Sequence, residues 1–375
     1  MELALGWAPS WWHNRLRGGD VTTDQMLAVL DYLEVDPVTF IERSLQSQHL
    51  ELDRPSGPSP DLVERAARRL SSTRQTAGVG KEFLDELDET VYQDPGGSIP
   101  LLEGLVDRVA LEEVPKLLEI AGACFSRRFR LEEAHHASFS AVNRSSQLGD
   151  QRSLGNSLRR HVYILLYRGQ CEEALALADR AAGILLRAND PVGLAKSGVE
   201  QALCLSYLGR YQEALPLFEL AHKRLPSTEK RYICASHLQM ANTYLSLGDY
   251  PRTLRALESA HPLNHHLART DQPKLVWIKA RVFRDRSRLD LAADLFRGVF
   301  RDLVRTRSMD APESGRDLAQ VLLLEGRGVE AVEVASRALE LTEAFKDNRF
   351  AQAVLPDLLQ VRREGLEMAR ASLGG

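Results

Sequence analysis

One short pattern recurs six times in this chain at nearly constant intervals. In its clearest copies a glycine is followed two positions later by an apolar residue and three positions after that by alanine, as in Gly209-Arg-Tyr211-Gln-Glu-Ala214. The alanine position, filled once by threonine, falls at 134, 174, 214, 253, 292 and 331, so the successive differences are 40, 40, 39, 39 and 39. A fixed period of this size is the sequence signature of a solenoid, in which one supersecondary unit is stacked repeatedly.

Each copy also carries the parts of a helical hairpin. Apolar residues occur at helical spacing before the glycine, as in the run from Leu203 to Leu208. Glycine suits the end of the first helix because it adopts the left-handed conformation without a Cβ penalty. The small residue lets the second helix approach the first closely. This small residue is the first member of an apolar stripe along the second helix. The stripe continues four and seven positions later, at Ala178, Ala181, Phe218, Ala221, Leu257, Ala260, Phe296, Val299, Ala335 and Ala338.

The composition agrees with stacked helices and excludes several other classes of protein. Hydrophobic residues make up 44% of the 375 residues and the formal net charge is −4, which excludes wholesale disorder and a generally basic nucleic-acid-coating protein. No apolar run is long enough to span a membrane, and the first residues lack the pattern of a signal peptide, so we expect a cytoplasmic protein. The four cysteines form no Cys-x-x-Cys pair and are predicted to be buried thiols rather than disulfides or metal ligands.

The repeat resembles the tetratricopeptide repeat (TPR). The matching residues are those of the third copy, Gly209, Tyr211, Ala214, Phe218, Ala221 and Pro226. The resemblance covers about residues 115–345 and implies an all-α protein, a TPR-like α-solenoid built as a right-handed superhelix of helical hairpins. The family's usual period is about 34 residues, so the longer period here predicts longer helices or loops.

The first fifty residues have a different pattern, which resembles the repressor-type (Xre family) helix-turn-helix. The resemblance rests on Leu3-Ala4-Leu5-Gly6-Trp7, on a following segment that ends in Arg17-Gly18, and on Leu33-Glu-Val-Asp-Pro37 before Phe40. The family's first helix has no counterpart here. The resemblance implies that a recognition helix faces DNA with Ser10, Trp11, His13, Asn14 and Arg17.

Charge argues for a second interpretation of this segment. Residues 1–50 carry three basic and seven acidic side chains, a net charge of −4, which is the wrong sign for attracting phosphate. The alternative is therefore a vestigial unit that packs on the repeats without binding DNA.

These patterns predict five parts of the chain. Three prolines between Arg54 and Pro60 predict a linker, and helical segments are expected at about residues 61–71 and 81–92. The predicted parts are a helix-turn-helix-like unit without its first helix (1–46), a Pro-rich linker (47–60), a helical extension (61–114), about six TPR-like repeats (115–345), and a C-terminal capping helix and tail (346–375).

The first helices of TPR hairpins line a concave groove, so the resemblance also predicts a ligand-binding face. In this family Asn, Arg and Lys on that face hold the backbone or carboxylate of a peptide. The register assigns to it Arg159, Tyr163, Lys196, Gln239, Asn242, Trp277, Arg281 and Arg284. The alternative is a solvated helix face, and for Trp277 burial between repeats is the favoured interpretation.

No pattern in the chain predicts catalysis, a metal or a cofactor. Gly78-Val-Gly-Lys81 lacks the spacing and the Ser/Thr of a phosphate loop, and the pairs His135-His136 and His265-His266 lack the spacing of metal ligands. We therefore expect a bacterial regulator or adaptor that is not an enzyme, with a protein or peptide ligand in the TPR groove, DNA as a second partner and no membrane. The alternative function is a pure TPR scaffold for protein–protein interaction.

Overall fold

The computed structural model describes residues 81–374, except residues 94, 104, 106–108, 110, 129 and 346–348. The predicted helix-turn-helix-like unit, its five DNA-facing residues and the Pro-rich linker lie outside the described residues. The chain divides into two compact units, Met1–Arg128 and Phe129–Gly375.

The described part of the first unit is a small helical cluster. It contains α6 (Lys81–Gln93), α7 (Pro95–Glu103), a short 3-10 helix (Leu111–Glu113) and α8 (Val114–Arg127). Leu84 and Leu87 of α6 share an apolar core with Ile120 of α8. The helix predicted over residues 81–92 is thereby confirmed, and Pro95 begins the next helix at a position where its missing N–H costs nothing.

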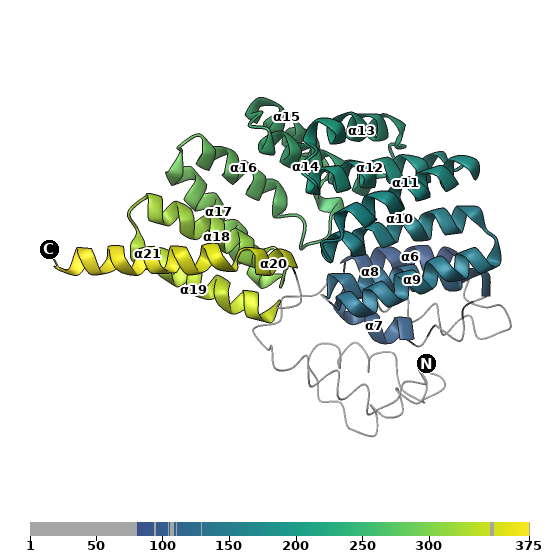
Figure 1. The fold of residues 1–375 in the computed structure, drawn as a ribbon, viewed down its shortest axis with the longest axis horizontal. Helices are drawn as coiled ribbons and strands as arrows, with labels where there is room; N and C mark the ends of the chain where they lie inside the picture. Colours follow the sequence, from purple (N-terminus) through teal and green to yellow (C-terminus); the bar gives the residue numbers. More distant parts are fainter. Residues whose placement is uncertain are drawn as a thin grey trace, which may run out of the picture. The chain divides into compact units, whose positions relative to one another are not determined.

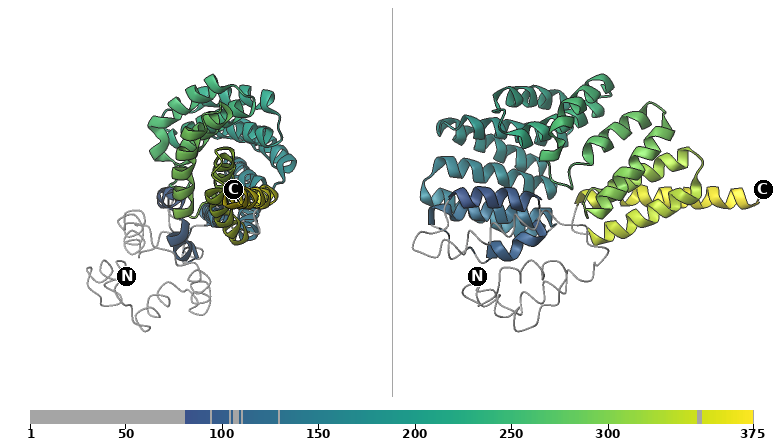
Figure 2. Two further views of the ribbon diagram at one scale, coloured as in Figure 1. Left: turned by 90° about the vertical axis from the view of Figure 1, so that its left-hand side faces the viewer. Right: turned by 180° about the vertical axis from the view of Figure 1, so that it is seen from behind.

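The second unit is a row of helical hairpins in which each helix packs against the next (Figure 1). Figure 2 shows the same row from two further sides. The helices are α9 (Leu131–Leu148), α10 (Gln151–Tyr167), α11 (Cys171–Arg187), α12 (Pro191–Tyr207), α13 (Tyr211–Arg224), α14 (Lys230–Ser246), α15 (Tyr250–Ala260), α16 (Lys274–Asp285), α17 (Leu289–Arg305), α18 (Ala311–Leu324), α19 (Gly328–Ala344), α20 (Arg349–Ala353) and α21 (Leu355–Gly374), with a 3-10 turn at His261–His266.

The recurring small residue lies in the interior of each hairpin. Every one of the six is fully buried, and the stripe four and seven positions later is buried as well. The first helices α10, α12, α14 and α16 also contact one another in succession. The predicted α-solenoid is therefore confirmed for the described residues.

The predicted helix ends are confirmed by the backbone. Gly169, Gly209, Gly248 and Gly326 all have positive φ, and Ser287 takes the same conformation in a copy that lacks glycine. After Gly209, the Arg210 N–H donates to the Leu205 carbonyl at 2.8 Å, which satisfies a carbonyl that the helix itself leaves unpaired.

The extra residues of the long period lie mainly in the helices. Three successive helices, α10, α11 and α12, have 17 residues each. Only short connections separate them, so that two long helices and two tight turns account for the whole period. Later in the chain the residues between α15 and α16 form a longer connection instead.

The last copy of the pattern departs from the others for a packing reason. It has Gly328 where the other copies have an apolar residue. A Cβ at Gly328 would lie 2.9 Å from the Gly365 carbonyl oxygen, and a Cβ at Gly365 would lie 2.9 Å from the Gly328 carbonyl oxygen. The two glycines thus let α19 and α21 cross at close range.

The cysteines behave largely as predicted. Cys124, Cys204 and Cys234 are buried, Cys171 is half-buried, and all four are free thiols. Burial raises the pKa of Cys204 to about 12 and that of Cys234 to about 11, so these thiols stay protonated.

Candidate ligand-binding face

The eight residues predicted to face a ligand all lie on first helices of the hairpins. Arg159 and Tyr163 belong to α10 and Lys196 to α12. The α14 residues are Gln239 and Asn242, and α16 carries Trp277, Arg281 and Arg284. We call the side of the solenoid formed by α10, α12, α14, α16 and α18 the first-helix face.

Arg159 is at the centre of a buried network that joins three hairpins. Its Nη1 donates to Glu200 Oε1 at 2.5 Å and to the Tyr232 hydroxyl at 2.6 Å. Glu200 is fully buried and its Oε2 has no hydrogen-bond partner. Burial raises the pKa of Glu200 to about 7 despite the attraction of Arg159. Arg159 is therefore already bonded to Glu200 and Tyr232 within the protein.

Lys196 extends this network towards the surface. Its Nζ lies 2.8 Å from Glu229 Oε1 and 4.7 Å from the centre of the Tyr232 ring. Tyr163 lies nearby on α10, and burial together with the charge of Glu200 raises its pKa. The Tyr163 hydroxyl thus remains a hydrogen-bond donor at neutral pH.

A second network occupies the other end of the first-helix face. Asp317 of α18 is buried and accepts from Trp277 Nε1 at 2.9 Å and from Arg281 Nε at 2.7 Å. The Arg281 guanidinium stacks over the Trp277 ring at 4.5 Å and also donates to Glu313 at 2.6 Å. Arg284 Nη1 lies 3.6 Å from Asp317 Oδ1. The burial favoured for Trp277 is confirmed.

Between these two networks lie the amides of Gln239 and Asn242. Both residues are half-buried on α14. Within the described part of the chain, neither side chain makes a hydrogen bond, whereas the main-chain carbonyls of both residues accept from side chains one turn later. A side-chain amide has one acceptor oxygen and two donor hydrogens. It can therefore bond to both the N–H and the C=O groups of an extended peptide backbone.

Helices far apart in the sequence meet on this side of the solenoid. The Tyr207 ring of α12 lies 5.4 Å from the Phe350 ring of α20. Lys274 at the start of α16 lies 3.0 Å from Asp271 and 2.9 Å from Asp310, which precedes α18. The C-terminal part of the second unit thus returns towards α12.

Sequence reasoning missed the carboxylates that pair with the predicted cations. Glu200 follows Arg159 by 41 positions, and Asp317 follows Trp277 by 40 and Arg281 by 36. Each partner is thus displaced by about one repeat along the chain. A search for opposite charges at the repeat period could have found both pairs.

The described residues show neither a metal centre nor a membrane span. No group of three or more His, Cys, Asp and Glu side chains among them is suited to a metal ion. Nor does any described helix have the length and apolarity needed to cross a bilayer.

The comparisons with known proteins concern the fold. Neither the protein-family models nor the curated proteins include a match to this sequence. Among solved structures, a Rap protein complexed with Competence and Sporulation Factor is similar at a TM-score of 0.54 and 13% identity, over 82% of this chain and 94% of that one. The fold is a TPR-like α-solenoid.

A second similar structure supports the TPR-like fold. It is the APC/C hetero-tetramer Cut9–Hcn1, with a TM-score of 0.53 and 14% identity. The similarity covers 82% of this chain and 56% of that one.

Proposed function

We propose that the TPR-like solenoid binds an extended peptide or protein segment along its first-helix face and acts as a regulator or adaptor. The observation that carries this proposal is the pair of unengaged amides, Gln239 and Asn242, between two networks of paired charges. The similar Rap structure, a complex with Competence and Sporulation Factor, supports a binding role for this architecture.

The eight residues divide into two roles in this proposal. Gln239 and Asn242 bind the ligand's main chain and Tyr163 contacts its side chains, while Lys196 and Arg284 exchange their partly exposed partners, Glu229 and Asp285, for its carboxylate. Arg159, Trp277 and Arg281 hold the helices at the spacing that the ligand needs, because their polar groups are already bonded to Glu200 or Asp317. A role in binding rather than catalysis fits this division.

A peptide library displayed on phage and selected on the full-length protein tests the proposal. The selected peptide should bind Asn242→Ala and Gln239→Ala about tenfold more weakly than the wild type, which is the loss expected for one or two buried hydrogen bonds. The matched control is Gln212→Ala, an exposed glutamine on the second helix α13, which should bind like the wild type. Equal affinity of all four proteins would remove the amides from the site.

We propose further that the N-terminal segment links ligand binding to DNA. This part rests on the resemblance to the repressor-type helix-turn-helix, in which Asn14 and Arg17 read bases or phosphate. Gel shifts of the full chain on genomic fragments should show salt-sensitive binding that Asn14→Ala and Arg17→Ala weaken. If neither the wild type nor a version extended by its upstream coding frame shifts any fragment, the DNA-linked function is excluded.

The alternative is a pure scaffold with a vestigial N-terminal segment. The net charge of −4 over residues 1–50 favours it, because that segment repels phosphate. Under this alternative the selected peptide still binds the first-helix face, while DNA has no effect on its affinity.

A further inference from the structure

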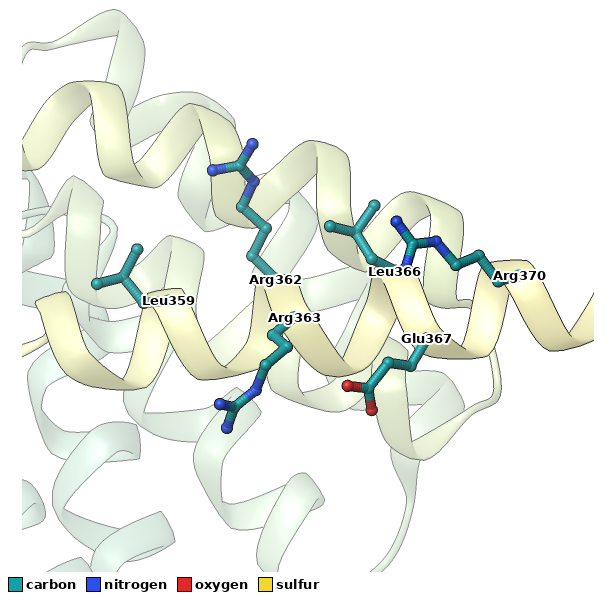
Figure 3. A pocket seen from close by; sticks show the side chains of 6 residues that line it. All are labelled: Leu359, Arg362, Arg363, Leu366, Glu367 and Arg370. Atoms are coloured by element: carbon teal, nitrogen blue, oxygen red, sulfur yellow. The ribbon is translucent and has the colours of Figure 1, made fainter.

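The last helix, α21, has a face that no other part of the described protein covers. Its packing face is formed by Leu358 and Val361, which lie with the preceding Val354 in an apolar cluster that includes Ala335 and Ala338 of α19. A second face carries six exposed side chains (Figure 3), namely Leu359, Arg362, Arg363, Leu366, Glu367 and Arg370. This second face is called the α21 stripe below.

The α21 stripe combines exposed leucines with unpaired arginines. Leu359 is 51% exposed and Leu366 is 39% exposed, one heptad apart. Arg362, Arg363 and Arg370 flank them, and within the described residues none of these three guanidiniums has an ion-pair partner. Most other arginines of this unit are bonded to a carboxylate, as Arg297, Arg327 and Arg337 are. This face of α21 thus presents three guanidiniums and one carboxylate around two exposed leucines.

We propose that the α21 stripe docks an acidic amphipathic helix of a partner protein. Leucines one heptad apart fit the apolar seam of a helix laid alongside. In Figure 3 the side chains of Arg362 and Arg370 point in the same direction as the leucines, and that of Arg363 points to the opposite side of the helix. Carboxylates of the partner helix could therefore pair with arginines on both sides of the apolar seam. From Leu359 to Arg370 the stripe is about 16 Å long, which is about three helical turns.

A second copy of this chain fits the stripe poorly. An antiparallel pair that sets Leu359 against Leu366 of the second copy also sets Arg362 against Arg363 of that copy. A parallel pair sets each arginine against its own counterpart. Like charges directly opposed across an interface are unfavourable, so the charge pattern selects a partner of opposite sign.

Nucleic acid fits less well than an acidic helix. Phosphates would satisfy the arginines but leave the two leucines exposed to water. An acidic helix covers the leucines and pairs with the arginines together.

A designed peptide tests the proposal with the full-length protein. The probe is a synthetic helix with leucines one heptad apart and glutamates flanking them, and its binding is measured by fluorescence anisotropy. The double variant Arg362→Glu/Arg363→Glu should bind this probe at least about tenfold more weakly than the wild type. A second probe with lysine in place of each glutamate should show the reverse preference, binding the double variant and not the wild type.

The matched control is Arg180→Glu/Arg187→Glu on α11. Both arginines are exposed and neither has an ion-pair partner among the described residues, so the change in net charge is the same. This variant should bind the acidic probe within about twofold of the wild type.

Three results would overturn the proposal. The first is no binding of the acidic probe to the wild type at about 1 mM, or an equal loss in both double variants. The second is a duplex DNA that binds the wild type more tightly than the probe and is lost in Arg362→Glu/Arg363→Glu. The third is a dimer, seen by sedimentation, that this same variant dissociates.

Discussion

At the scale of single residues, the buried pair of Arg159 and Glu200 decides how the first-helix face holds together. Arg159 connects α10 to Glu200 of α12 and to Tyr232 of α14 through one guanidinium. A buried charge is tolerated only while its partner remains, so removing one member costs more than replacing both by apolar groups. A single variant therefore measures the free-energy cost of leaving one charge buried alone. A double variant with apolar residues at both positions measures the net contribution of the ion pair to stability.

We predict that Arg159→Ala lowers the free energy of unfolding by about 3 to 5 kcal/mol, because it leaves the Glu200 carboxylate buried alone. The double variant Arg159→Met/Glu200→Leu should recover most of that loss. Urea unfolding followed by circular dichroism measures both. If both variants lose the same free energy of unfolding, the ion pair itself stabilises the fold, and the loss in Arg159→Ala is not due to an unpaired buried charge.

A second residue-scale prediction concerns the buried histidine of α10. His161 is bonded to Ser138, and its pKa is lowered to about 4 by burial, with smaller contributions from His135 and Arg168. Below pH 6.5 the unfolded chain takes up this proton before the folded protein does. The stability that the neutral imidazole provides is thus complete above pH 6.5 and is lost progressively towards pH 4.

We therefore expect the wild type to lose about 2 to 3 kcal/mol more than His161→Gln between pH 7.5 and pH 4.5. Glu200, with its raised pKa, has the opposite effect over much of this range, but it is present in both proteins and cancels in the difference. Urea unfolding at the two pH values gives the comparison. The control is His265→Gln at an exposed position, which should retain the wild-type dependence.

At the scale of helices, packing between α19 and α21 depends on two glycines. A methyl group at Gly365 would meet the Gly328 carbonyl at 2.9 Å and the Val332 side chain at 2.8 Å. Backbone cannot yield as a side chain can, so the two helices would have to separate. We predict that Gly365→Ala lowers the free energy of unfolding by about 1 to 3 kcal/mol.

Gly298→Ala on α17 is the matched control for that change. No atom lies within 4 Å of a Cβ at this position, so alanine meets open space. Alanine is the better helix former, and the control should be neutral or more stable by up to about 1 kcal/mol. Thermal unfolding of both variants tests the pair, and a destabilised control together with an unaffected Gly365→Ala would contradict the packing argument.

At the scale of the whole second unit, we expect a destabilising substitution to affect its own hairpin and the adjacent hairpins, but not distant ones. Each hairpin contacts the next, and stability is approximately a sum over repeats and their interfaces. In Gly365→Ala we predict faster hydrogen exchange in α18, α19 and α21, with wild-type protection retained in α10 to α13. Exchange measured by mass spectrometry reports both regions, and uniform loss of protection would indicate a single cooperative unit.

The sequence predicted the solenoid well because small residues at a fixed period have few other uses. Ala174 and Ala214 could be placed at helix contacts from their spacing alone, and Gly209 could be placed at a helix end. The face proposed for a ligand was harder. The register placed Arg159 and Arg281 on first helices, but which carboxylates neutralise them depends on the angle between neighbouring hairpins. A linear pattern does not contain that angle, so Glu200 and Asp317 were missed.

The polar networks have a mechanical consequence for the second unit. Directional bonds through Arg159 and Lys196 tie α10, α12 and α14 together, and bonds to Asp317 tie α16 to α18. Between α14 and α16 the shared material is an apolar cluster that includes Leu238 and Ile278. Hydrogen bonds fix the relative direction of two helices more strictly than apolar contacts do, so we expect the solenoid to bend most easily between α14 and α16, an elbow that the Tyr207–Phe350 contact also spans. Gln239 and Asn242 lie at that elbow, where a bound chain would set the angle of the joint.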